Sequence, residues 1–425
     1  MGYRKLFSGL NMPIALENGE SVIPINFDNA ATTPPLKCVN NTLIQNILMY
    51  GSVGRGKGQR SEYCTQVYED TREFMLDFFN VKHRENYSVI YVKNTTEGVN
   101  LLAKSLIKNK DEVIITTRME HHANDLPWRN ACKVVYIDVD KNGKLDLNDI
   151  EKVLRKNSGR AKYFTITAAS NVTGYVNDIN KIAKIAHRYG IKIIVDAAQL
   201  VAHKKINIGG YEKDDYIDYL VFSGHKIYAP FGSGVVIGLK KDLDSGEELL
   251  KGGGAVEVVL DDKVYVEKTP HKYEAGTPNF LGIVAISSAM KSLLATGFEN
   301  IEKHEKDLRN HLIKGLKTID RTILYGDESD DERLGVVTFN IEGIGHDIVA
   351  KRLADFRGIA VRHGGFCAHP YVRRLLGISK ETAYNYAING IDMPGMVRAS
   401  FGLYNNEQEV EEFVDTLKKI INRYK

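Results

Sequence analysis

The chain has 425 residues, of which 43% are hydrophobic and 26% are charged. This length suits two or three domains, and the composition is that of a globular protein rather than a disordered or fibrous one. The net charge of +3, from 57 basic and 54 acidic residues, is too balanced to indicate a nucleic-acid partner.

The cysteines and the N-terminal residues indicate the cellular compartment in which the protein is expected. Cys38, Cys64, Cys132 and Cys367 lie far apart and form no CxxC pair, so neither a disulfide framework nor a zinc site is expected. The first residues lack the apolar core of a signal peptide, and no apolar run approaches the ~20 residues of a membrane span. We therefore expect a cytoplasmic protein that does not contact a membrane.

Residues 88–238 alternate between short β-branched runs and helix signals. The runs that predict strands are SVIYV, DEVIIT, KVVYIDV, YFTITA, IKIIVDAAQ, DYLVFSG and GVVIG. The clearest helix follows Asp178, which can cap its first turn, and ends at Gly190. Strands that alternate with helices predict an α/β fold, in which a mostly parallel sheet lies between helices.

After residue 281 the pattern predicts a smaller α+β domain. A long helix should end at Gly297, and further helices are expected over residues 299–317, 346–356 and 407–424. Strands are expected over residues 334–343 and 358–362. We expect three parts: an N-terminal segment that packs on the small domain, a large domain and a small C-terminal domain, over residues 1–26, 27–295 and 296–425.

Ligands of an open parallel sheet bind beyond the carboxyl ends of its strands. Asn94 follows one predicted strand and can cap the next helix, which leaves Thr95 and Thr96 in a first turn whose free N–H groups attract phosphate. Asp196 ends another strand, where a buried carboxylate needs a cation or hydrogen bonds. A plain helix start and a structural aspartate are the alternatives.

Lys226 lies between an apolar run and a glycine-rich run, beside Ser223 and His225. Partial burial favours the neutral form of a lysine, and neutral amines form Schiff bases with aldehydes. Pyridoxal phosphate combines an aldehyde, a phosphate and a ring nitrogen that pairs with a carboxylate. Lys226, Asp196 and the helix start after Asn94 together indicate a pyridoxal phosphate site.

Other polar residues allow two interpretations each. The adjacent His121 and His122 are poorly placed to share a metal ion, so no metal is expected; one of them could lie against an aromatic ligand or cap a helix. Arg398, in an apolar-flanked strand, would bind a carboxylate of a ligand or of the protein. Cys367 follows two glycines and is either a reactive thiol or a small buried residue.

The chain resembles the class V, fold-type I pyridoxal-phosphate enzymes, and within them the cysteine desulfurase and selenocysteine lyase branch. The segments that carry the resemblance are FDNAATT, NTTEGVN, MEHHANDLPW, SNVTG, VDAAQ, FSGHK, EAGTPN, VRHGGFCAHP and VRASFGLYN, over residues 27–405. The resemblance implies a fold-type I transferase with a large cofactor-binding domain and a small C-terminal domain.

The resemblance also implies how each matching residue would bind the cofactor. Lys226 would hold pyridoxal phosphate as a Schiff base, His121 would stack on the ring, Asp196 would pair with the ring nitrogen and Gln199 would bond the phenolic oxygen. The residues that would hold the phosphate are Thr95, Thr96, Ser223 and His225. Thr277 would reach the phosphate of a neighbouring subunit, which implies a homodimer.

The implied activity is that of a cysteine desulfurase. Asn171, Arg362 and Arg398 would bind the substrate carboxylate, Lys226 would move the α-proton, and Cys367 would take sulfur from L-cysteine as a persulfide, leaving L-alanine. A sulfur-acceptor protein would then collect the sulfur. Phe366 stands where the family usually has a histidine, so another class V reaction, by an aminotransferase or lyase in which Cys367 is not essential, stays open as the alternative.

Overall fold

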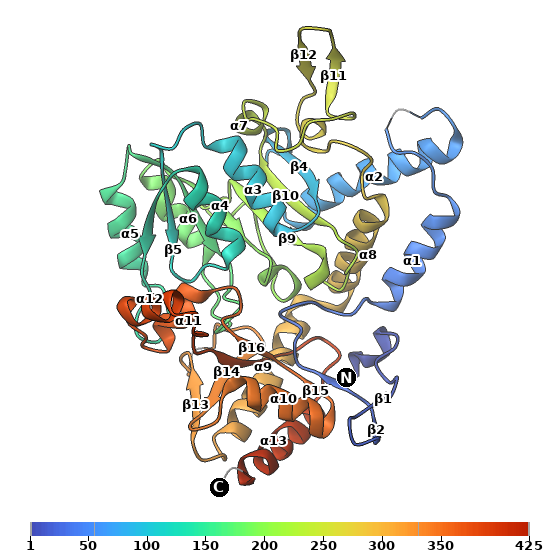
Figure 1. Ribbon diagram of the computed structural model, residues 1–425. Helices are drawn as coiled ribbons and strands as arrows, with labels where there is room; N and C mark the ends of the chain where they lie inside the picture. Colours follow the sequence, from blue (N-terminus) through green and yellow to red (C-terminus); the bar gives the residue numbers. More distant parts are fainter. Residues whose placement is uncertain (1, 55, 330, 424–425) are drawn as a thin grey trace.

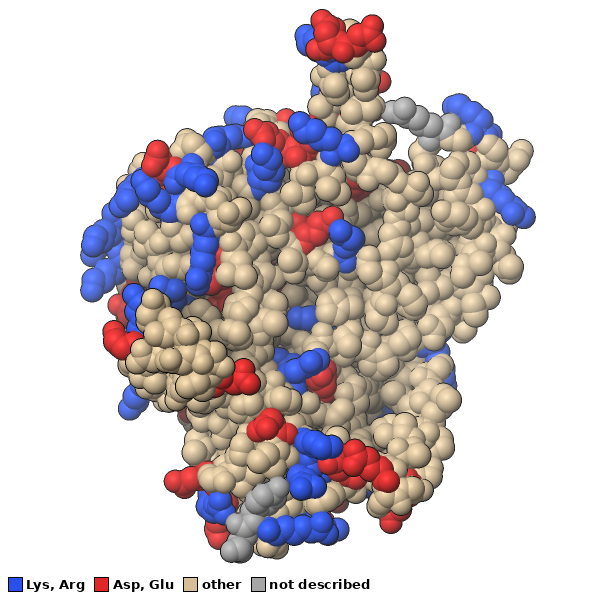
Figure 2. All heavy atoms as spheres, in the orientation of Figure 1, with Lys and Arg blue, Asp and Glu red and all other residues tan. Residues whose placement is uncertain are grey.

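The computed structural model describes residues 2–54, 56–329 and 331–423. Figure 1 shows a larger body, which holds the central sheet, and a smaller body below it. A hairpin of β11 (Val256–Val259) and β12 (Val264–Val266) projects from the top of the larger body. On the face drawn in Figure 2, basic and acidic side chains are mixed over both bodies.

The central sheet has seven strands in the spatial order β4-β10-β9-β8-β7-β5-β6. The strands are β4 (Tyr87–Val92), β5 (Val113–Thr117), β6 (Lys133–Ile137), β7 (Ala161–Thr167), β8 (Lys192–Asp196), β9 (Tyr219–Ser223) and β10 (Gly234–Leu239). β10 runs antiparallel to both of its neighbours, β4 and β9, and the remaining pairs of neighbouring strands in this sheet are parallel. All seven predicted strands are present, and the predicted mostly parallel sheet is confirmed.

Both faces of the sheet are covered, which explains the continuous apolar runs in the sequence. Every residue of β5 and of β9 is buried. Successive side chains of a strand point to opposite faces. Accordingly Ile194 packs in one apolar cluster with α3 (Thr95–Leu106) and α4 (Leu126–Ala131). Its neighbours Ile193 and Val195 pack in another with α6 (Ile179–Arg188) and α8 (Phe280–Thr296).

The helices of the larger body follow the signals in the sequence. They are α1 (Lys37–Leu48), α2 (Gln59–Phe78), α3 (Thr95–Leu106), α4 (Leu126–Ala131), α5 (Leu147–Lys156), α6 (Ile179–Arg188), α7 (Lys240–Asp244) and α8 (Phe280–Thr296). The Asp178 carboxylate accepts from the Lys181 N–H, 3.1 Å away, and so caps α6 as expected. Gly190 follows the helix with a φ of 68°, which glycine adopts without strain.

The smaller body contains an antiparallel sheet of β13 (Thr322–Tyr325), β14 (Val336–Ile341), β17 (Met396–Ser400) and β16 (Arg362–Gly364). Its helices are α9 (Phe298–Leu316), α10 (His346–Arg357), α11 (His369–Leu375), α12 (Lys380–Ile388) and α13 (Glu407–Asn422). Tyr424, the predicted end of the last helix, lies outside the described residues. Among the described helices none alone is long and apolar enough for a membrane span; only the bent pair α8 and α9 passes that test together.

The single strand expected over residues 358–362 is two strands in different sheets. β15 (Ile359–Ala360) pairs in parallel with β3 (Ile25–Asn26), and β16 then joins β17. The N-terminal segment, which also forms the pair β1 (Ile14–Ala15) and β2 (Ser21–Val22), causes this division because it supplies the extra partner strand. The division into three parts, with its two boundaries, stays a prediction.

Candidate active site

The carboxyl ends of the parallel strands open into a cavity of about 320 Å³ between the two bodies. Strand register helps to set its floor, because Thr167 of β7 and Asp196 of β8 lie side by side and both line the cavity. The predicted site residues that line the cavity are Thr95, Thr96, His121, Asn171, Asp196, Gln199, Ser223, His225, Lys226, Arg362, Cys367 and Arg398. Thr277 instead lines a separate cavity, with Glu97 and Glu274.

Lys226 ends a short 3₁₀ helix (Gly224–Lys226) directly after β9. Gly224 begins this turn, and a Cβ there would lie 2.8 Å from Ile286, so a larger residue would displace the turn. Burial lowers the pKa of Lys226 to about 8, although the nearby Asp196 carboxylate opposes the shift. A useful fraction of the amine is therefore neutral just above pH 7.

Asp196 is a buried carboxylate at the end of β8. Its Oδ1 accepts from the Ala198 N–H at 2.9 Å. Burial raises its pKa, and the hydrogen bond from Ala198 and the charge of Lys226 work against that shift. A cationic N–H group in the cavity would stabilise the ionised carboxylate.

The start of α3 forms one wall of the cavity. Asn94 caps the helix by accepting from the Glu97 N–H at 2.9 Å, and the Thr95 N–H and hydroxyl each lie 2.8 Å from the Ser223 hydroxyl. A Cβ on Gly98 would lie 2.6 Å from Val221, so this glycine allows the helix to lie close to the sheet. Thr95, Thr96 and Ser223 line the cavity at this end, and a helix start with such hydroxyls suits a phosphate.

Two histidines of the cavity are held in the neutral form. Burial first, and then the charge of Lys226, lowers the pKa of His121 to about 3 and that of His225 to about 4. The Nδ1 atom of His121 accepts from the Ala123 N–H at 3.0 Å, which leaves Nε2 to carry the proton. A neutral imidazole is suited to lie against a ring.

Arg398, on β17, supplies a buried cation. Its Nη1 donates to the Asn171 carbonyl at 2.9 Å, and its Nη2 lies 3.2 Å from Asp28 Oδ1. The other Asp28 oxygen lies 2.7 Å from Arg362 Nη2. The Arg398 Nε is buried without a hydrogen-bond partner among the described residues. A buried guanidinium with a spare N–H indicates a site for a carboxylate.

The turn that carries Cys367 closes the cavity from the smaller body. Phe366 and Cys367 have φ values of 50° and 52°, in the left-handed region that residues other than glycine rarely adopt. Asn171 Nδ2 donates to the Phe366 carbonyl at 2.8 Å, and the Phe366 ring centre lies 5.0 Å from the Arg398 guanidinium carbon. Cys367 is exposed.

The family model Aminotransferase class-V matches residues 25–413. The chain belongs to this family. Among curated class-V relatives, it is 33% identical to the cysteine desulfurase of Wigglesworthia glossinidia brevipalpis, over 96% of each chain. It is 34% identical to that of Cronobacter sakazakii, over 87% of this chain and 86% of the other.

A solved structure supports the same assignment. The apo structure of cysteine desulfurase from Thermococcus onnurineus NA1 superposes with a TM-score of 0.82, at 32% identity over 94% of this chain and 95% of the other. The predicted resemblance to the class-V family and its cysteine desulfurase branch, and the predicted fold, are therefore confirmed.

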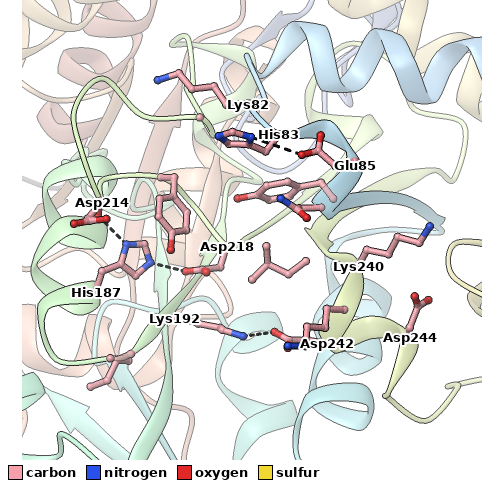
Figure 3. A pocket seen from close by; sticks show the side chains of 18 of the residues that line it. Lys82, His83, Glu85, His187, Lys192, Asp214, Asp218, Lys240, Asp242 and Asp244 are labelled. Carbon is pink, nitrogen blue, oxygen red and sulfur yellow. Dashed lines mark hydrogen bonds and ion pairs between the residues drawn. The ribbon is translucent and has the colours of Figure 1, made fainter.

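This class-V protein also contains a cavity of about 1120 Å³ at the opposite, amino end of the parallel strands. Figure 3 shows its charged side chains, many of which pair with one another. His187 Nε2 lies 2.8 Å from Asp218, and Lys192 lies 2.5 Å from Asp242. Because these charges are paired within the protein, size alone does not make this cavity the active site.

Two residues near the site received no role from the sequence. Asp28 links Arg362 and Arg398, and His122 contacts the Cys367 turn. Asp28 offered a signal, because it is a charge in the otherwise uncharged stretch INFDNAA. His122 offered none beyond its place next to His121, since its partners lie more than 240 positions away.

Proposed function

We propose that the protein is a pyridoxal-phosphate-dependent cysteine desulfurase, which converts L-cysteine to L-alanine and holds the sulfur on Cys367 as a persulfide. The observation that carries the proposal is that Lys226, Asp196, Arg398 and Cys367 line one cavity. These residues supply an amine for an aldehyde, a carboxylate for a ring nitrogen, a cation for the substrate carboxylate and a thiol for its sulfur.

The residues of the cavity fit pyridoxal phosphate. Lys226 would hold its aldehyde carbon, Asp196 would face the ring nitrogen and His121 would lie against the ring. Gln199, whose Nε2 donates to the Ala30 carbonyl at 2.9 Å, would bond the phenolic oxygen. The phosphate would be held by Thr95, Thr96, Ser223 and His225. When bound, the cofactor supplies a ring that withdraws electrons from the substrate α-carbon.

The substrate would be oriented by its carboxylate. Arg398 brings a buried guanidinium to the lining of the cavity, and Arg362 adds a second positive charge there. The carboxylate of Asp28 forms ion pairs with both guanidinium groups. Asn171, whose amide holds the Phe366 carbonyl, would turn to the substrate carboxylate. This set selects an α-amino acid with a short side chain that reaches Cys367.

Lys226 and Cys367 would carry out the chemical steps. The neutral Lys226 amine accepts the α-proton of L-cysteine, and its pKa of about 8 makes that form accessible. The Cys367 thiolate attacks the substrate sulfur, so that an S–S bond forms as the C–S bond breaks. The bond electrons remain on the β-carbon, which is then protonated. L-cysteine and the Cys367 thiol thus yield L-alanine and a Cys367 persulfide, with no external oxidant.

The persulfide then requires an acceptor, and the exposed position of Cys367 allows a protein thiol to approach it. We also propose a homodimer in which Thr277 reaches the phosphate of the partner subunit. This fits the place of Thr277 in a cavity separate from Lys226. A cytoplasmic location without membrane contact completes the proposal.

The second candidate is a class V aminotransferase or lyase that acts on another small amino acid without Cys367. Phe366 favours it, because this residue places an aromatic ring, and no proton-transferring group, next to the thiol. Alanine and sulfide formed from L-cysteine, measured with dithiothreitol for the wild type and Cys367→Ser, separate the two. Loss of both products only in Cys367→Ser supports the desulfurase. Failure of both proteins to form the two products from L-cysteine would favour the second candidate.

A further inference from the structure

His122 links the larger body to the turn that carries Cys367. Its main-chain N–H donates to the Cys367 carbonyl at 2.6 Å. Its side-chain Nε2 accepts from the main-chain N–H of His369 at 3.2 Å. One residue therefore contacts the turn at the nucleophile and again two positions beyond it.

The turn needs such contacts because its backbone is unfavourable. Phe366 and Cys367 are consecutive non-glycine residues with positive φ, which costs free energy that the surroundings must offset. Within the turn, the Ala368 N–H donates to the Gly365 carbonyl at 2.8 Å. From the larger body, Asn171 holds Phe366, and His122 holds the following residues.

The surroundings of His122 keep its ring neutral, so that Nε2 can accept a hydrogen bond. The ring of His369 packs edge-on against the His122 ring, with centroids 4.6 Å apart, and His121 is its other imidazole neighbour. Burial and the charges of His369 and Arg129 lower the pKa of His122, and only Asp125 opposes them. The ring is thus neutral at pH 7, with the proton on Nδ1.

We propose that His122 is a positioning residue, which fixes the Cys367 turn at the cavity by accepting from the His369 N–H while donating to the Cys367 carbonyl. His369 lies just beyond the thiol and provides its main-chain N–H rather than its side chain for this contact. The structural part of the inference concerns only this chain's own residues, whereas its kinetic part rests on the proposed function.

Hydrogen exchange with peptide-level mass spectrometry tests the structural part in the purified holoenzyme. In His122→Leu, the peptide that contains His369 should exchange about tenfold faster, because one hydrogen bond is lost. His122→Gln, whose Oε1 can replace Nε2, should exchange like the wild type. His363→Leu, a change of an exposed histidine on β16, is the control. Unchanged exchange in His122→Leu would overturn the proposal.

The pH dependence gives a second test that does not need the leucine variant. Protonation puts a hydrogen on Nε2, so the wild-type turn should lose protection, relative to intrinsic exchange, as the pH falls through the lowered pKa of His122. His122→Gln cannot be protonated and should keep its protection. Parallel loss in both proteins would contradict the proposal even if His122→Leu failed to fold.

Kinetics then tests the functional consequence. Displacement of the thiol turn should lower the kcat for alanine formation in His122→Leu by roughly 10- to 100-fold, as expected for a misplaced reacting group. The KM for L-cysteine should change little, and His122→Gln should restore kcat. If the wild type makes no alanine, the proposed function fails, yet the exchange experiments still decide whether His122 positions the turn.

Discussion

The carboxylate of Asp28 lies 3.2 Å from the guanidinium of Arg398, and its second oxygen pairs with Arg362. A residue near the N-terminus thus pairs with two cations that come from the smaller body. Arg398 is almost fully buried, and burial lowers its pKa to about 10. The carboxylate of Asp28 opposes this shift and so stabilises the buried charge of Arg398.

Replacement of Asp28 should destabilise the fold. Asp28→Ala leaves Arg398 buried without its charged partner, and we expect a loss of about 1–3 kcal/mol in the free energy of unfolding. Urea unfolding measures this loss. Asp138→Ala, which removes a more exposed partner of Arg374, is the matched control and should change stability by less than about 0.5 kcal/mol. Equal effects of the two changes would contradict the inferred stabilisation.

The Lys226 amine should make the stability of the cofactor-free protein depend on pH. Its folded pKa, about 8, lies below the unfolded value, so the unfolded chain binds more protons between these two values and stability rises with pH there. Lys226→Met should therefore be more stable than the wild type at pH 7, by roughly 2–3 kcal/mol. The difference should shrink as the pH approaches 10.

Urea unfolding at pH 7 and pH 10 measures this difference. Lys380→Met, a substitution of an exposed lysine on α12, provides the control, for which we expect no trend with pH. A stability difference between Lys226→Met and the wild type that stays constant over this range would show that burial does not depress the Lys226 pKa.

The cysteines should differ in reactivity in the native protein. Cys367 is exposed, whereas Cys64 and Cys132 are buried, and burial raises the pKa of Cys132 to about 11. Because the thiolate is the reactive form, Cys132 should react with iodoacetamide at pH 8 at least roughly 100-fold more slowly than Cys367. Peptide mass spectrometry after timed labelling gives both rates. Similar rates would mean that the described burial does not persist in solution.

Gly98 should be required for the fit of α3 on the sheet. In Gly98→Ala the new methyl group would lie 2.6 Å from Val221 and 2.9 Å from Val236. Overpacking of this kind costs about 1–3 kcal/mol, which exceeds the roughly 1 kcal/mol that alanine adds as a helix former. The free energy of unfolding, measured with urea, should fall. The amount of pyridoxal phosphate retained after gel filtration should fall as well.

Gly58→Ala is the matched control for this change. Gly58 precedes α2, and a Cβ there would have no neighbour within 4 Å. Stability and cofactor content should stay close to those of the wild type. If Gly98→Ala behaved in the same way as Gly58→Ala, close packing of α3 on the strands would control neither the stability of the protein nor its cofactor content.

The strands and the cavity residues were predictable because local rules govern them. Apolar runs predicted β8 and β9, and the position of Asp196 and Lys226 just beyond these runs predicted that they would meet at one edge of the sheet. The contact of Asp28 with Arg398 and that of His122 with His369 were not predictable. Each joins segments more than 240 positions apart, and depends on how the smaller body packs against the larger one.

The division of residues 358–362 between two sheets could not be predicted from local sequence patterns either. The run GIAVR has the pattern of one strand, but the N-terminal β3 pairs with its first part. Arg362 then joins β17, where it pairs across the sheet with Arg398. No local pattern encodes this competition between partner strands, which arises only when distant segments have come together.

The antiparallel course of β10 has a mechanical consequence for Lys226. Because β9 and β10 are hydrogen-bonded neighbours, both ends of the connection over residues 224–233 are anchored, and the Gly224 N–H donates to the Ser233 carbonyl at 2.7 Å. The Thr33 N–H holds the His225 carbonyl at 3.0 Å. The backbone of Lys226 is therefore held in place, while its long side chain remains able to rotate. Its amine can move by rotation about side-chain bonds, without any loop having to open.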